Sequence, residues 1–131
     1  PALADALAQI ALLYLSQEKW AEAELPAQQC LAIQRRQRLG SWQQYIAQSQ
    51  LGGCLWGLAR TNEAGPLLTG AAEGLKPLVA AVPMIDRARV REAFTRLVKF
   101  CEATSRPVEG ARWQRELDQL PMNFPTPSPK P

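Results

Sequence analysis

The sequence predicts an all-α protein of about three antiparallel helix pairs, on the strength of three observations. Alanine and leucine supply much of the apolar 47% of the 131 residues, whereas aromatic residues make up only 7%. Apolar residues recur at spacings of three and four, the period of a helix with one buried face. No stretch of five or more residues alternates between apolar and polar types with the β-branched content of a strand.

The first pair is expected at about 2–38. The apolar stripe of its first helix, 2–16, is formed by Leu3, Leu7, Ile10, Ala11 and Tyr14. The second helix, about 20–38, contains Pro26, and proline is tolerated only in a first turn. This helix therefore either starts later than residue 20 or bends at the proline. Gly40 suits the position after its end.

The second pair is expected at about 42–80. Ser41 is a candidate N-cap for a helix over 42–59, and a further helix is expected over 62–75. Gly52 and Gly53 would let that helix press close, with its own small residues Ala64, Ala71 and Ala72 facing them. Pro77 should end or kink the fourth helix.

The third pair is expected at about 83–119. Pro83 could open its first helix, which ends near residue 104, and the second helix runs over about 108–119. Residues 120–131 contain five prolines and should form an extended linker or a disordered tail. Because the chain does not begin with methionine, we expect it to be a piece of a longer protein.

A repeat runs through the three pairs. Six positions of the first pair recur 41 residues later in the second, and again 46 residues later in the third. The three sets are Ile10, Ala11, Tyr14, Glu22, Ala23 and Cys30; Leu51, Gly52, Leu55, Glu63, Ala64 and Ala71; and Leu97, Val98, Cys101, Glu109, Gly110 and Leu117. Large residues would fill the seam between pairs, while small ones would let the two helices of a pair approach.

These patterns resemble tetratricopeptide repeats: Ile-Ala-x-x-Tyr followed by Trp-Ala-Glu-Ala, then Leu-Gly-x-x-Leu followed by Asn-Glu-Ala. The spacing is similar to the long repeats of kinesin light chains. Over roughly residues 7–118, the segments LAIQRR, SQLGGCLWG, VREAFTRLVKFCEA and EGARWQREL resemble the carboxy-terminal repeats of bacterial, planctomycete-type serine/threonine kinases. The resemblance implies a right-handed solenoid, protein interaction as its function, and a kinase domain upstream of this chain.

In such solenoids the first helix of each pair lines a concave groove. By that mapping the groove residues are Ala8, Gln9, Leu12, Ser49, Gln50, Gly53, Trp56, Thr95, Arg96 and Lys99. The strongest candidates for partner binding are Gln9, Gln50, Gly53, Trp56, Arg96 and Lys99.

Trp56 could act as an aromatic anchor beside a recess at Gly53, or it could instead pack under a neighbouring loop. Arg96 and Lys99 could hold an acidic peptide or a carboxylate, or form a solvated face with neighbouring acidic residues. The other tryptophans are expected in the core or at the seams between pairs, and they are Trp20, Trp42 and Trp113.

Several functional classes are disfavoured. The chain has no histidine, the commonest general base and zinc ligand, and no phosphate-binding glycine loop, so we expect no enzymatic activity, metal or cofactor. No apolar run approaches the ~20 residues of a membrane span. Three cysteines in apolar surroundings suggest reduced core thiols and a cytoplasmic location. The three cysteines are Cys30, Cys54 and Cys101.

The sequence thus predicts a protein–protein interaction scaffold that binds a peptide or partner protein in a helical groove. One alternative is a regulatory segment of a larger kinase. RNA binding by the basic run Arg87, Arg89 and Arg91 is a weaker alternative, because the net charge is only +3 and acidic residues interrupt the run. Self-association is also possible, because Leu3, Leu7 and Ile10 at the first helix have no capping repeat to cover them.

Overall fold

Within residues 2–121, which the computed structural model describes, the chain forms six α-helices and two short 3-10 helices and contains no strand. The elements are α1 (Ala2–Ser16), α2 (Trp20–Gln37), α3 (Trp42–Gly57), α4 (Thr61–Leu75), η1 (Lys76–Ala81), η2 (Met84–Asp86), α5 (Arg87–Ala103) and α6 (Pro107–Asp118). The all-α prediction is confirmed. From residue 122 onward, the expected proline-rich tail lies outside the described residues.

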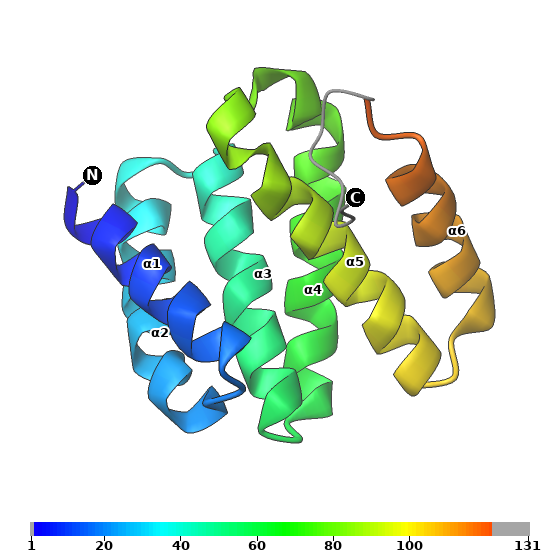
Figure 1. Ribbon diagram of the computed structural model, residues 1–131, viewed down its shortest axis with the longest axis horizontal. Coiled ribbons are helices and arrows are strands. Elements are labelled where there is room, and N and C mark those ends of the chain that lie inside the picture. Colours follow the sequence, from blue (N-terminus) through cyan, green and yellow to red (C-terminus); the bar gives the residue numbers. More distant parts are fainter. Residues whose placement is uncertain (1, 122–131) are drawn as a thin grey trace, which may run out of the picture.

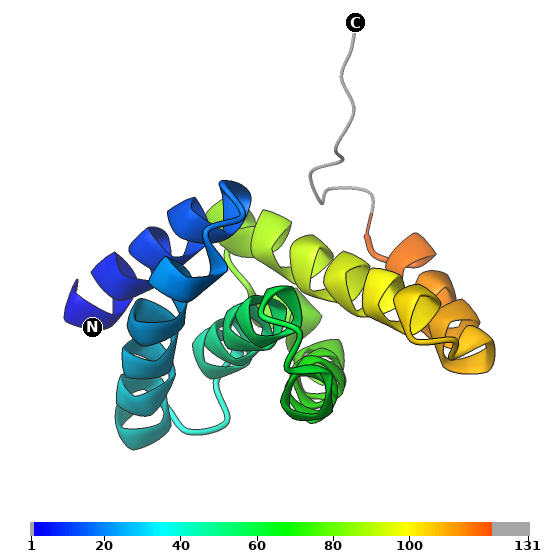
Figure 2. The same cartoon turned by 90° about the horizontal axis from the view of Figure 1, so that it is seen from below.

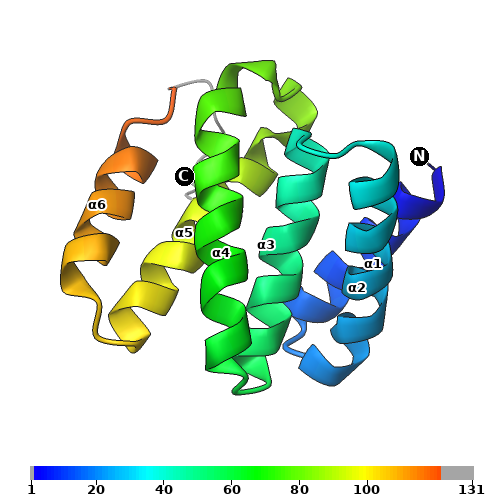
Figure 3. The ribbon, with the colours of Figure 1, turned by 180° about the vertical axis from the view of Figure 1, so that it is seen from behind.

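The helices pack in sequence order, and the odd-numbered helices also touch one another. Contacts join α1 to α2, α2 to α3, α3 to α4, α4 to α5 and α5 to α6, and α3 also contacts both α1 and α5. Figure 1 shows α1 and α5 flanking α3 on the near side, and Figure 2 shows both of them on one side of α3. Seen from behind, α4 and α2 come to the front (Figure 3). The helix α3 is therefore covered on one face and flanked by two helices on the other.

The same type of turn connects the first helix of each pair to the second. A residue with a left-handed backbone follows the first helix at Glu18 (φ 57°), Ala59 (φ 63°) and Ser105 (φ 58°). The next N–H then donates back to the helix: Lys19 to Tyr14 O at 2.9 Å, Arg60 to Leu55 O at 2.8 Å, and Arg106 to Cys101 O at 2.8 Å. Successive turns are 41 and 46 residues apart, which are the two steps of the sequence repeat.

Most of the helix boundaries follow the sequence. Ser41 is the N-cap of α3, because its Oγ accepts a hydrogen bond from Gln44 N at 3.2 Å. The helix α3 ends at Gly57 rather than at residue 59, since Ala59 adopts the left-handed turn. The fifth helix begins at Arg87 rather than at Pro83, because Pro83 is extended (ψ 150°) and a 3-10 turn intervenes.

The two prolines at which the sequence left alternatives open, Pro26 and Pro77, have different outcomes. The helix α2 begins at Trp20 and continues through Pro26 to Gln37, so the alternative of a later start is wrong. Pro77 is the second residue of η1, which follows directly on the end of α4 at Leu75. Of the two predictions for Pro77, an end or a kink of the fourth helix, the structure shows the end.

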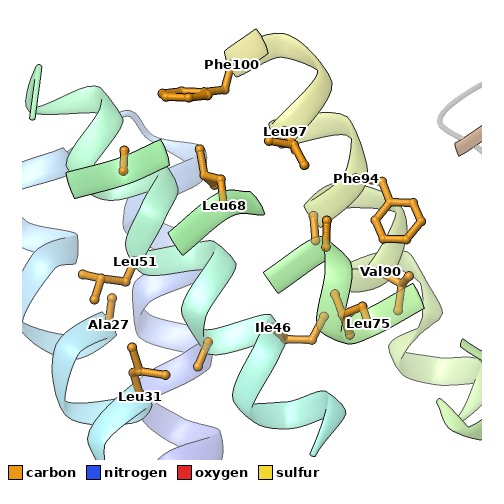
Figure 4. Close-up of a cluster of buried hydrophobic side chains, with 14 of the residues drawn as sticks. Ala27, Leu31, Ile46, Leu51, Leu68, Leu75, Val90, Phe94, Leu97 and Phe100 are labelled. Carbon is orange, nitrogen blue, oxygen red and sulfur yellow. The ribbon is translucent and has the colours of Figure 1, made fainter. Parts of the chain in front are cut away.

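The core is continuous across the helices, as the close-up in Figure 4 shows for leucine, isoleucine and phenylalanine side chains from α2 to α5. The small face of α4 is fully buried: Ala64, Ala71 and Ala72 have no exposed surface. A Cβ atom added at Gly52 would lie 2.9 Å from the Leu68 side chain. The predicted close approach of α3 and α4 at Gly52 is therefore confirmed.

The α1 end of the structure leaves apolar side chains in contact with solvent. Leu3 is 65% exposed and Ile10 is 43% exposed, whereas Leu7 is half-buried. Self-association through this end stays a prediction. None of the helices in the described part of the chain is both long enough and apolar enough to cross a membrane.

Candidate functional site

Two clefts open along α3, and they adjoin at Leu12 of α1. The first, here called the amide cleft, has a volume of about 370 Å³. It is lined by Asp5, Ala8, Gln9, Leu12, Cys30, Gln34, Arg38, Trp42, Gln43, Ile46, Ala47, Gln50, Asp86 and Arg89. The second, here called the tryptophan cleft, has a volume of about 290 Å³. It is lined by Leu12, Leu15, Ser16, Trp20, Gly53, Trp56, Glu92 and Arg96.

Five of the six predicted partner-binding residues line one or other of the two clefts. Gln9 and Gln50 line the amide cleft, and Gly53, Trp56 and Arg96 line the tryptophan cleft. Lys99 is exposed and lines neither cleft. The prediction that Gln9 of α1 and Gln50 of α3 share one groove came from the resemblance to tetratricopeptide repeats, in which the first helix of each pair lines the groove.

Arg96 reaches from α5 across the surface of α3. Its Nη1 donates a hydrogen bond to Ser49 Oγ at 2.6 Å. A Cβ atom at Gly53 would lie 2.7 Å from Arg96 Cδ and 2.8 Å from Nε, so the glycine makes room for the arginine. Burial lowers the pKa of Arg96, and the nearby Glu92 carboxylate partly offsets this effect. Arg96 therefore occupies the space where a Gly53 side chain would lie, and Gly53 lines the tryptophan cleft together with Trp56.

Trp56 is half-buried against α5. Its ring meets Phe100 edge-on, with centroids 5.4 Å apart and planes at 86°. Trp56 therefore packs against helix α5 and not under a neighbouring loop. Trp20 lies across Gly57, where a Cβ would be in collision with the indole, and it lines the same cleft as Trp56. The two indoles and Arg96 thus form one amphipathic surface.

Sequence reasoning missed several lining residues. Trp20 and Trp42 pack against the core, and Trp20 lies at the seam against Gly57 as the sequence predicted, but they also line the tryptophan and amide clefts, which was not predicted. Trp113 is fully buried as expected. Asp5 and Asp86 were not singled out at all, although both line the amide cleft. A run of glutamines on the otherwise buried α3 was the one available signal for a polar cleft.

The basic run of α5 is largely engaged within the protein. Arg87 Nε donates to Val82 O at 2.9 Å, and Arg89 forms an ion pair with Glu92 at 2.7 Å. Arg96 is bound to Ser49, as described above. These contacts draw three of the basic side chains toward the protein, which does not favour a continuous nucleic-acid surface.

All three cysteines are buried free thiols, in agreement with the sequence interpretation. Cys54 donates to Trp20 O at 2.9 Å, and Cys30 donates to Ala4 O at 3.4 Å. Burial raises the pKa of both thiols to about 11, with a further contribution from Asp5 for Cys30 and from Glu24 for Cys54. They are therefore neutral, weakly reactive core groups near neutral pH.

The raised thiol pKa values predict a loss of stability in alkali. Between about pH 9 and 11 the unfolded chain releases the thiol protons while the folded chain retains them. The free energy of unfolding should then fall as pH rises, by up to about 1.4 kcal/mol per pH unit for each thiol. Urea unfolding across this pH range measures the slope. The Cys54→Ala variant should show a shallower slope, and equal slopes would contradict the assignment.

No family model, curated protein or solved structure matches this chain. The resemblance to tetratricopeptide repeats and to kinase-associated repeats therefore stays a prediction drawn from the residues themselves. Within residues 2–121, no group of three or more acidic or cysteine side chains is arranged to hold a metal ion.

Proposed function

We propose that this chain is a non-enzymatic protein-interaction module of the tetratricopeptide type. In this proposal the helix pairs stack as a right-handed solenoid, with α1, α3 and α5 as the first helices of successive pairs. The identical turn in each pair and the contacts of α3 with both α1 and α5 support this arrangement. The reduced, buried thiols favour a cytoplasmic location.

The proposed ligand is an extended segment of a partner protein, bound along α3 between α1 and α5. The observation that carries this proposal is that the amide and tryptophan clefts both open along α3 and share Leu12 as a lining residue. Aromatic surface at one end and amide groups at the other suit a peptide, which presents apolar side chains and main-chain polar groups together. Association with a kinase domain stays a prediction of the resemblance.

Leu12 and its neighbour Leu13 provide a matched test of the groove. Leu12 is half-buried and lines both clefts, whereas Leu13 is 56% exposed and lines neither. Peptides would be selected from a displayed library of random twelve-residue sequences on the whole chain, and their affinities measured by calorimetry. We expect Leu12→Ala to weaken binding about tenfold and Leu13→Ala to leave it unchanged.

Circular dichroism melting of both variants would show that each is folded. Failure to select any binding peptide would contradict the proposed function. Equal effects of the two leucine substitutions would place the binding surface elsewhere on the molecule.

A further inference from the structure

The amide cleft has an unusual lining for the interior of a helical protein. Four glutamines contribute to it: Gln9, Gln34, Gln43 and Gln50. Two of them are almost completely buried, since Gln34 is 3% exposed and Gln50 is 4% exposed. A buried amide group is unfavourable unless its carbonyl and its NH2 group both find partners.

Gln50 lacks such a partner. Its buried Oε1 accepts no hydrogen bond from any described residue. The other buried glutamines of α3 are used structurally: Gln44 Oε1 accepts from Gly40 N at 2.8 Å, and Gln44 and Gln48 are joined at 3.2 Å. Gln48 then donates to Leu67 O at 3.2 Å. Gln44 and Gln48 are thus hydrogen-bonded within the protein, whereas Gln50 Oε1 can accept a hydrogen bond from a ligand.

The charged groups of the cleft also favour a donor. Asp5 of α1 and Asp86 of η2 both line it, and neither forms an ion pair within residues 2–121. Arg89 is neutralised by Glu92 at 2.7 Å, which leaves Arg38 as the cation at this site that no acidic group pairs with among the described residues. Because the carboxylates of Asp5 and Asp86 outnumber the Arg38 guanidinium, the cleft weakly attracts a positive charge.

We infer that the amide cleft binds an extended peptide that carries a lysine or arginine side chain, with its cation near Asp5 and Asp86 and a main-chain N–H on Gln50 Oε1. Main-chain carbonyls would accept from Arg38 and from the glutamine NH2 groups. The terminal amide torsion of glutamine is soft, so Gln50 can turn its carbonyl toward the ligand at little cost. This inference rests on the proposed function and specifies what one half of the groove recognises.

Three blocked pentapeptides that differ only in their central residue provide the test: lysine, glutamate or norleucine. Each is titrated into the whole isotope-labelled chain, and the NMR signals of α3 and of the glutamine side chains are followed. We expect the lysine peptide to shift these signals and to bind about three- to fivefold more tightly than the norleucine peptide. The glutamate peptide should bind more weakly than both.

Three variants test the contribution of the cleft carboxylates separately from that of the Gln50 carbonyl. Combined Asp5→Asn and Asp86→Asn should remove the preference for lysine, whereas Glu18→Gln with Glu22→Gln, which neutralises two exposed carboxylates outside the cleft, should preserve it. Gln50→Met keeps the side-chain volume and removes the unpartnered carbonyl, so it should weaken all three peptides without loss of thermal stability.

The outcomes distinguish this inference from the proposed function. Tighter binding of the glutamate peptide, or unchanged affinities in Gln50→Met, would overturn the inference while library-selected peptides still bound through Leu12. If the pentapeptides left the cleft signals unmoved while selected peptides bound, the inference would likewise fall alone. If neither the pentapeptides nor selected peptides bound, both would fall.

Discussion

Replacing Trp113 by alanine is expected to lower the free energy of unfolding by about 3–5 kcal/mol. Trp113 is fully buried between α5 and α6, and its ring packs against Phe94 with centroids 5.5 Å apart. A loss of this size is a large share of the stability of a small domain, so α6 should detach from α5 first. Urea unfolding followed by far-ultraviolet circular dichroism measures the loss, and limited proteolysis detects the release of α6.

Trp113→Phe is the matched control. The indole Nε1 of Trp113 is buried and has no hydrogen-bond partner among the described side chains and backbone. Phenylalanine keeps an aromatic ring and removes this unpartnered donor, so the expected loss is only about 1 kcal/mol. Equal losses for the two substitutions would show that the contact between α5 and α6 does not depend on the aromatic ring.

The second large effect is expected where Gly52 of α3 faces Leu68 of α4. Leu68 is 1% exposed, and Leu68→Ala should cost about 2–5 kcal/mol because it leaves a cavity in the core. Gly52→Ala alone gains about 1 kcal/mol of helix propensity but loses about 1–3 kcal/mol to overpacking, since the new Cβ would lie 2.9 Å from Leu68. In the Leu68→Ala background the Leu67 Cβ, at 3.3 Å, is the close contact that remains for the new Cβ among those at Gly52, so Gly52→Ala should be much less destabilising there than in the native background.

A double-mutant cycle measures this coupling, which we expect to be about 1–3 kcal/mol. Gly53→Ala serves as the control on the adjacent residue, because its Cβ would meet only the flexible, half-buried Arg96 side chain. Its unfolding free energy should change little, although the hydrogen bond from Arg96 to Ser49 would be disturbed. Strict additivity of Gly52→Ala and Leu68→Ala would mean that the two helices do not meet as the structure shows.

The local features of the fold were predictable because their causes are local. The 2–16 helix and the Ser41 cap depend on apolar spacing and on a hydroxyl group beside free backbone N–H groups. The small residues of α3 and α4 also predicted the close packing of these two helices. The start of α5 was wrong by four residues, because Pro83 allowed either a helix start or an extended chain and the 3-10 turn after it has no strong sequence signal.

The candidate site was only partly predictable. The resemblance to tetratricopeptide repeats implied that Gln9 and Gln50 lie in one groove, and both line the amide cleft. It could not place Asp86, which lies in the 3-10 turn between two pairs, or Trp20, whose position depends on contact with Gly57 of another pair. Side chains from separate elements meet only after the pairs have packed, and no spacing along the chain encodes that geometry.

The sequence by itself determined that this chain is helical, where its helices begin and end to within a few residues, and the 41- and 46-residue steps at which its turns recur. Only the tertiary structure decided that Arg96 occupies the space beside Gly53 and that two clefts open along α3. It also decided that Gln50 is left without a partner while Gln44 and Gln48 are satisfied. The physical reason is that helical periodicity is a property of one segment, whereas the filling of space and the pairing of buried polar groups depend on several segments at once.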